Sequence, residues 1–124
     1  MRREDARRDL VKCEDMRLFA DRAMRYMETR TADQFSADEI LQAAIVRCVS
    51  VVGEAANRVS TATQDRFPEI PWSAIIGMRN VLVHDYVDID PARIHFVVTV
   101  ELPRLVEVLE RVVVELEQDA GWED

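Results

Sequence analysis

The chain is poor in the residues that make turns, crosslinks and membrane spans. Its 124 residues include only 3 glycines and 4 prolines, too few for an all-β sandwich or barrel. No apolar run approaches the roughly 20 residues that a membrane-spanning helix needs. A charged segment at residues 2–5 stands where a signal peptide would be apolar. These absences predict one helical domain over residues 1–124, in the cytoplasm and without a membrane partner.

Cysteine is equally scarce. Cys13 and Cys48 both fall within helix-like segments, and their spacing matches no metal-ligand pattern. Free cysteine is usually buried and behaves as a small apolar residue. We therefore expect two reduced core cysteines and no structural metal.

Basic charge is scarce as well, and it is unevenly distributed. The formal net charge is −8, and residues 101–124 contain two arginines against eight acidic residues. Residues 1–30 contain nine basic and seven acidic residues. A continuous basic face for duplex DNA is not expected. Any contact with nucleic acid must be local or lie between subunits. The acidic C-terminal segment is either a solvated helix face or a docking surface for a basic partner.

What the chain does have is apolar residues, 48% of the total, which exclude a disordered protein. They recur at intervals of three and four residues, the period of an amphipathic helix. The pattern predicts an all-α fold, an antiparallel bundle of four to five helices. The four main helical segments are expected at about residues 6–28, 37–62, 72–84, and from 90 to about 120.

Local signals set the expected helix ends. Ser36 has the position of an N-cap, with Glu39 completing a capping box. Two prolines within residues 67–72 break the chain between the second and third helices. Asp90 and the proline after it should begin the last helix, in which Pro103 predicts a kink near residues 100–102.

Gly53 and Glu54 interrupt the apolar pattern of the second predicted helix. A glycine within a helix costs up to about 1 kcal/mol relative to alanine, so Gly53 predicts close helix packing or close approach of a ligand. Glu54 leaves two interpretations open. It is either a solvent-facing carboxylate or a buried acceptor for Arg79 or a backbone group.

Residues 77–86 concentrate polar side chains that can hold a phosphate and move a proton: Arg79, Asn80, His84 and Tyr86. On a regular helix, positions 79 and 84 lie about 140° apart. They can serve one site only if the helix ends between them or if two chains contribute. Asn80 and His84 are four residues apart and share a face, so the amide can orient the imidazole.

Arginine and histidine together suit the cleavage of RNA by its own 2′-hydroxyl. Histidine can take the proton from that hydroxyl or give one to the departing 5′-oxygen, and arginine can hold the phosphate. Such a reaction requires no metal. The alternative is structural: a histidine that caps a helix end and an arginine in an ion pair.

The spacing Arg79-x4-His84-x-Tyr86 resembles the Arg-x4-His-x-Tyr motif of the HepT toxin family, in the HEPN superfamily, and Asn80 matches the polar residue that commonly follows the arginine there. The resemblance extends over roughly residues 8–117. It includes the segments 35–36, 43–47, 52–55, 67–72, 76–80 and 102–103.

This resemblance implies an all-α homodimer whose two motifs face each other across a cleft. The implied activity is a metal-independent endoribonuclease that uses no cofactor, with Arg79 and His84 as the catalytic pair and Asn80 and Glu54 in support. The implied partners are RNA and an MntA-like nucleotidyltransferase antitoxin, which transfers AMP from ATP to Tyr86. The alternative is a non-catalytic subunit that binds nucleotide or substrate for such a nucleotidyltransferase.

Overall fold

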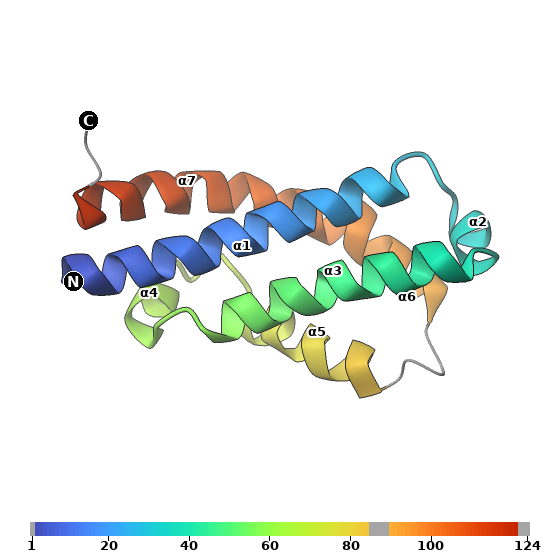
Figure 1. The fold of residues 1–124 in the computed structure, drawn as a ribbon, viewed down its shortest axis with the longest axis horizontal. Helices are drawn as coiled ribbons and strands as arrows, with labels where there is room; N and C mark the ends of the chain where they lie inside the picture. The colour runs from blue at the N-terminus through green and yellow to red at the C-terminus, as the bar shows by residue number, and fades with distance from the viewer. Residues whose placement is uncertain (1, 85–89, 122–124) are drawn as a thin grey trace.

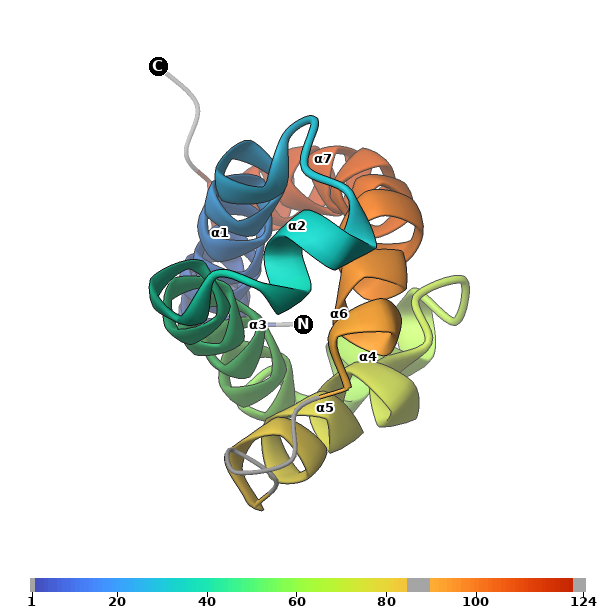
Figure 2. The same cartoon turned by 90° about the vertical axis from the view of Figure 1, so that its right-hand side faces the viewer.

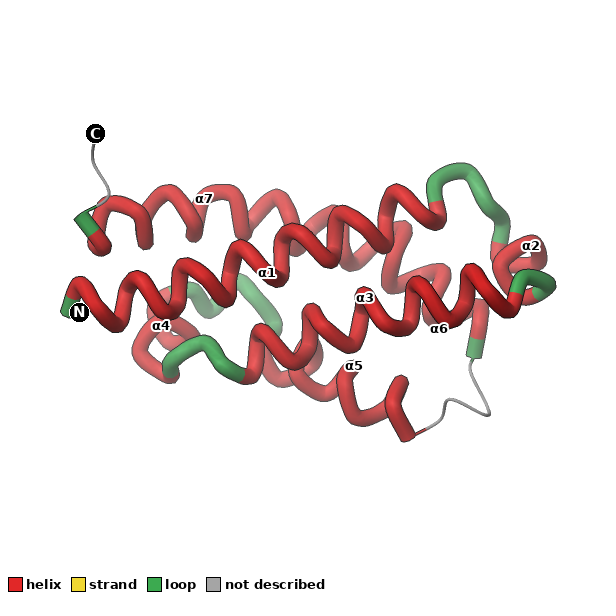
Figure 3. Tube along the Cα trace, in the orientation of Figure 1, coloured by secondary structure: helices red, strands yellow, loops and turns green. Residues whose placement is uncertain are grey.

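The computed structural model describes residues 2–84 and 90–121, and for residues 80–84 it describes the backbone alone. The described chain is helical, with loops between the helices and no strand (Figure 3). Its long helices are α1 (Arg3–Met27), α3 (Glu39–Asn57), α5 (Trp72–His84) and α7 (Leu102–Ala120). Shorter segments are α2 (Ala32–Ser36), α4 (Thr61–Arg66), α6 (Pro91–Phe96) and the π-helical turn η1 (Val97–Glu101).

The long helices form an antiparallel bundle, as the sequence predicts. Helix α1 lies between α3 and α7, and α5 packs against α3 on the side away from α1 (Figures 1 and 2). Consecutive long helices run in opposite directions, so the two ends of the described chain lie at the same end of the bundle (Figure 1). Helix α5 is thus an outer helix of the bundle.

The predicted apolar stripes form the core. Cys13, Met16 and Ala20 on α1 are fully buried, as are Ile45 on α3 and Leu109 on α7. The expectation for cysteine is also confirmed, because Cys13 and Cys48 are both free and buried. Burial raises the pKa of the Cys13 thiol to about 12, with the Asp9 carboxylate adding to the effect. Cys13 is therefore a protonated packing residue at neutral pH.

The start of α3 differs from the prediction. Ser36 is the last residue of α2 rather than an N-cap, so the predicted capping box with Glu39 is wrong. Asp38 caps α3 by accepting a hydrogen bond from the Leu41 backbone N–H at 3.0 Å. The capping box of this region lies earlier, between Thr31 and Gln34, and begins α2. A second good cap only a few residues away allowed an extra helical turn where we expected a connection.

The second predicted helix is also divided. Helix α3 ends at Asn57, and Ser60 then caps the short helix α4. The Asp9 carboxylate from α1, which is buried, accepts hydrogen bonds from the Ser60 backbone N–H at 2.9 Å and from its hydroxyl at 2.6 Å. This contact between residues distant in sequence fixes the break, and local periodicity could not reveal it.

The last helix follows the prediction closely. Asp90 caps α6 by accepting from the Arg93 backbone N–H, with proline at the first helical position. The disturbance expected from Pro103 is present as the π-helical turn η1, which precedes α7. A wider turn accommodates a proline that lacks its N–H and crowds the preceding carbonyl. Gly121 ends α7 in the left-handed conformation, with φ of 72°.

Within the described ranges, every helix is too short or too polar to cross a lipid bilayer.

Candidate functional site

The candidate site begins with the close packing of α5 on α3. A methyl group placed at Gly53 would lie 2.9 Å from the carbonyl oxygen of Ile75 and 3.0 Å from the backbone nitrogen of Arg79. Only a residue without a side chain allows the two backbones to approach this closely. The packing interpretation of Gly53 is thus confirmed. Its consequence is that Arg79 on α5 lies directly over α3.

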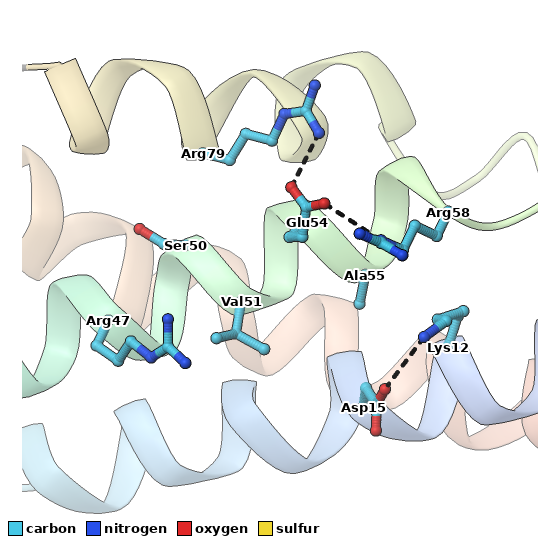
Figure 4. A pocket seen from close by; sticks show the side chains of 9 residues that line it. All are labelled: Lys12, Asp15, Arg47, Ser50, Val51, Glu54, Ala55, Arg58 and Arg79. Atoms are coloured by element: carbon cyan, nitrogen blue, oxygen red, sulfur yellow. Dashed lines mark hydrogen bonds and ion pairs between the residues drawn. The ribbon is translucent and has the colours of Figure 1, made fainter.

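This packing joins Arg79 to Glu54. The Arg79 Nη1 donates a hydrogen bond to Glu54 Oε2 at 2.9 Å, and the Arg58 Nε donates to Glu54 Oε1 at 3.2 Å. Figure 4 shows the carboxylate between the two guanidinium groups. One carboxylate therefore serves two arginines, and each of the two interpretations of Glu54 is half right: it is exposed, and it is the acceptor for Arg79.

The remaining hydrogen-bonding capacity of Arg79 is incompletely used. Its side chain is 30% exposed, and Nε is buried without a hydrogen-bond partner among the described residues. Buried polar groups are nearly always paired, so an unpaired donor invites a functional explanation. A planar guanidinium with free donors suits bidentate binding of a phosphate.

The two arginines also set the charge state of Glu54. Hydrogen bonds from Arg58 and then Arg79 lower the pKa of the Glu54 carboxyl below its ordinary value. The carboxylate is therefore ionised at neutral pH and does not act as a general acid. Its function in this arrangement is to orient Arg79.

Arg79 and Glu54 line a groove between α1, α3 and α5, which we call the basic groove. It has a volume of about 520 Å³ and contains four cationic and two anionic side chains. Its lining residues are Lys12, Asp15, Arg47, Ser50, Val51, Glu54, Ala55, Arg58 and Arg79 (Figure 4). An excess of two positive charges, on a chain whose net charge is −8, makes this a local site for an anion.

Helix α5 continues unbroken through both predicted catalytic positions, Arg79 and His84. One of the two conditions under which they could share a site, a helix end between them, is therefore not met. The Asn80 and His84 side chains and the whole of Tyr86 lie outside the described residues. Their predicted roles stay predictions.

Sequence reasoning did not select the other cations of the groove. Arg58 had a detectable signal, since it lies four residues after Glu54, the spacing of a helical ion pair. Lys12 had none, because α1 reaches the groove only through the packing of the bundle. The other histidine, His95, lies elsewhere, with its Nε2 2.8 Å from the carbonyl oxygen of Arg30.

The comparison with known proteins agrees with the geometry of the site. Residues 16–112 match the family model described as Ribonuclease HepT-like. A Methanocaldococcus jannaschii protein named "Putative RNase" is 24% identical over 104 residues, which are 84% of this chain and 90% of that protein. The "Probable ribonuclease HepT" of Thermococcus cleftensis is 30% identical over 73 residues, 59% of this chain and 66% of that protein. No solved structure matches the chain.

The family match covers helices α3 and α5 completely, and with them both arginines that contact Glu54. The family model and the helical architecture of the described residues thus agree. The chain belongs to the HepT-like ribonuclease family.

Proposed function

We propose that this protein is an endoribonuclease toxin that cleaves RNA without a metal ion, using Arg79 and His84, and that a nucleotidyltransferase antitoxin silences it by adenylylating Tyr86. The observation that supports it best is the state of Arg79. Its guanidinium is hydrogen-bonded to Glu54, has a buried Nε without a partner among the described residues, and lines a groove with excess positive charge. Membership of a ribonuclease family supplies the substrate class.

The chemistry assigns one task to each residue. The ribose 2′-oxygen attacks the adjacent phosphorus, and its proton passes to a base. The bond from phosphorus to the 5′-oxygen breaks, and that oxygen receives a proton from an acid. His84 performs proton transfer, since imidazole titrates near neutral pH. Arg79 binds the phosphate and stabilises the charge that develops on its oxygens. The products are a 2′,3′-cyclic phosphate and a 5′-hydroxyl.

The shape of α5 supports a site built from two chains. Because the helix runs through positions 79 and 84, these positions diverge by about 140° around its axis. A second copy facing the first would place His84 of one chain near Arg79 of the other. Gly77 supports such an approach: among the described residues, nothing lies within 4 Å of the position where its side chain would be. The packing of the described chain itself does not require a glycine there.

Adenylylation of Tyr86 suits this arrangement. The tyrosine oxygen would attack the α-phosphorus of ATP, with pyrophosphate as the leaving group and the phenolic proton passing to a base. Tyr86 is two residues from His84 in the sequence. The added group brings bulk and negative charge to the site that must receive an RNA phosphate, so it blocks cleavage.

The deciding experiment is RNA cleavage by purified protein in EDTA. Wild-type protein should cleave, His84→Ala should lose at least about 100-fold in rate, and His95→Ala, a change at the other histidine, should behave as wild type. Circular dichroism checks that all three are folded. Cleavage that persists in folded His84→Ala protein would contradict the assignment.

The antitoxin part is tested by co-expression with a minimal nucleotidyltransferase. Mass spectrometry of the peptide containing Tyr86 should show adenylyl groups, and the modified protein should be inactive. Tyr86→Phe protein should escape both effects. If a stable complex forms but the chain never cleaves RNA, it is a binding subunit for the nucleotidyltransferase instead.

A further inference from the structure

The basic groove is longer than the catalytic proposal needs. Arg79 and Glu54 occupy one part of it, whereas Arg47 and Ser50 lie further toward the N-terminal end of α3 (Figure 4). Arg47 and Glu54 are seven residues apart on one helix, so they lie on the same face and about 10 Å apart along its axis. The groove thus has a second end, to which the proposed cleavage reaction assigns nothing.

Arg47 is the least engaged cation of this groove. Its side chain is exposed and makes no hydrogen bond or ion pair within the described part of the chain. Three arginines of α1 pair with a carboxylate three or four residues away: Arg8 with Glu4, Arg17 with Glu14 and Arg25 with Asp21. At the corresponding distances, Arg47 has only Ala43, Ala44, Ser50 and Val51.

Ser50 adds a polar partner one turn further along the same face. It is half-buried, and its hydroxyl makes no side-chain hydrogen bond within the described residues. Guanidinium and hydroxyl groups, such as these two in the lining of the groove, commonly contact nucleic-acid phosphates. Lys12 lies across the groove on α1 and adds positive charge to the lining. It is 4.0 Å from Asp15, at the limit of an ion pair.

We propose that Arg47 and Ser50 form a second phosphate-binding subsite, which holds single-stranded RNA whose cleaved phosphate lies at Arg79. This inference rests on the proposed function. A strand advances about 3.4 Å per nucleotide when its bases are stacked, so the spacing of about 10 Å between Arg47 and Glu54 along α3 equals the rise of about three nucleotides. Arg47 and Ser50 would contact the RNA backbone and not the bases, so the subsite does not select a base sequence. It raises the affinity for RNA and takes no part in the cleavage reaction.

The test measures binding without cleavage. In a His84→Ala background, a fluorescein-labelled single-stranded oligoribonucleotide of mixed sequence is titrated by fluorescence anisotropy at several salt concentrations. Arg47→Ala should weaken binding about tenfold. It should also reduce the slope of log K against log salt by about 0.7, the value for one lost phosphate contact on a single strand. Ser50→Ala should weaken binding less.

Arg25→Ala is the matched control, because it removes an exposed arginine from α1 that lies outside the groove. It should leave affinity and salt slope unchanged. Unchanged affinity in Arg47→Ala, or equal losses in both arginine variants, would overturn the subsite. So would a change in oligomeric state on sedimentation with RNA affinity intact, since that result makes the groove an interface between copies of the chain.

A kinetic readout separates this inference from the proposed function. In the otherwise wild-type enzyme, Arg47→Ala should raise KM for RNA and leave kcat unchanged. If the wild type cleaves RNA and Arg47→Ala has the same KM, the subsite fails and the catalytic proposal stands. If wild type does not cleave and Arg47-dependent RNA binding persists, the catalytic proposal fails and the subsite remains as an RNA-binding site.

Discussion

Two clusters in this protein combine arginine guanidinium groups with carboxylates, in opposite proportions. In the basic groove, Glu54 accepts from two arginines, Arg58 and Arg79. Elsewhere in the bundle, Arg66 of α4 pairs with two carboxylates of α7, Asp119 and, at 3.9 Å, Glu115. The Arg66 guanidinium also lies over the Phe67 ring, 5.1 Å from its centroid.

This difference in local charge distinguishes an arginine that holds helices together from one that can bind an anion. Arg66 faces two carboxylates of α7, and these ion pairs attach α4 to α7. Arg79 shares its only carboxylate among the described residues, and its Nε lacks a partner. A cluster with excess positive charge attracts an anion, whereas a cluster with excess negative charge repels one.

The largest difference between the two clusters is expected when Arg79 or Arg66 is changed to lysine, which keeps the positive charge and removes the planar guanidinium group. Arg79→Lys should lower kcat/KM for RNA by about 100-fold or more, as expected when a preorganised donor is lost from a developing oxyanion. Arg66→Lys should leave cleavage unchanged. Parallel RNA-cleavage assays in EDTA measure both. Equal losses in the two variants would mean that the clusters do not differ in function.

An intermediate effect is expected from Gly53→Ala. The added methyl group meets backbone atoms of Ile75 and Arg79 at 2.9 to 3.0 Å, so α5 must move away from α3. We expect a loss of about 1 to 3 kcal/mol in the free energy of unfolding, measured by urea denaturation, together with weaker cleavage as Arg79 leaves Glu54.

Gly77→Ala is the control for that experiment. It replaces the glycine of α5 by alanine, and among the described residues no atom lies within 4 Å of the new methyl group. Its stability should be unchanged or higher by up to about 1 kcal/mol, the helical preference for alanine over glycine. A Gly53→Ala protein as stable as the wild type would show that α5 is not fixed by this contact.

The smallest effect is electrostatic and concerns Glu54. Its carboxyl pKa should lie below the ordinary value of 4.5, and Arg58→Ala and Arg79→Ala should each raise it. NMR titration of the carboxyl carbon measures this. Because the folded-state pKa is lowered, the contribution to stability is present above the unfolded-state value and disappears as the pH falls through the folded-state value. A Glu54 pKa insensitive to Arg79→Ala would break the link between the two helices.

The sequence allowed the helices and the candidate site to be predicted to different extents. Apolar periodicity is a local property, and it located α1, α5 and the last helix to within a few residues. The ends of α3 were missed because they depend on competition between neighbouring caps and on Asp9, which is 51 residues from Ser60. The pairing of Glu54 with Arg79 was one of two open interpretations, since it depends on how closely two helices approach.

By itself, the sequence determined that this is an all-α protein with Arg79 and His84 about 140° apart on one helix, because both follow from periodicity and helical geometry. Only the tertiary structure decided which groups surround Arg79. The absence of a side chain at Gly53 brings α5 over α3, and the bundle brings Lys12 of α1 to the same groove. These contacts join residues far apart in the chain, and they arise only when the helices pack.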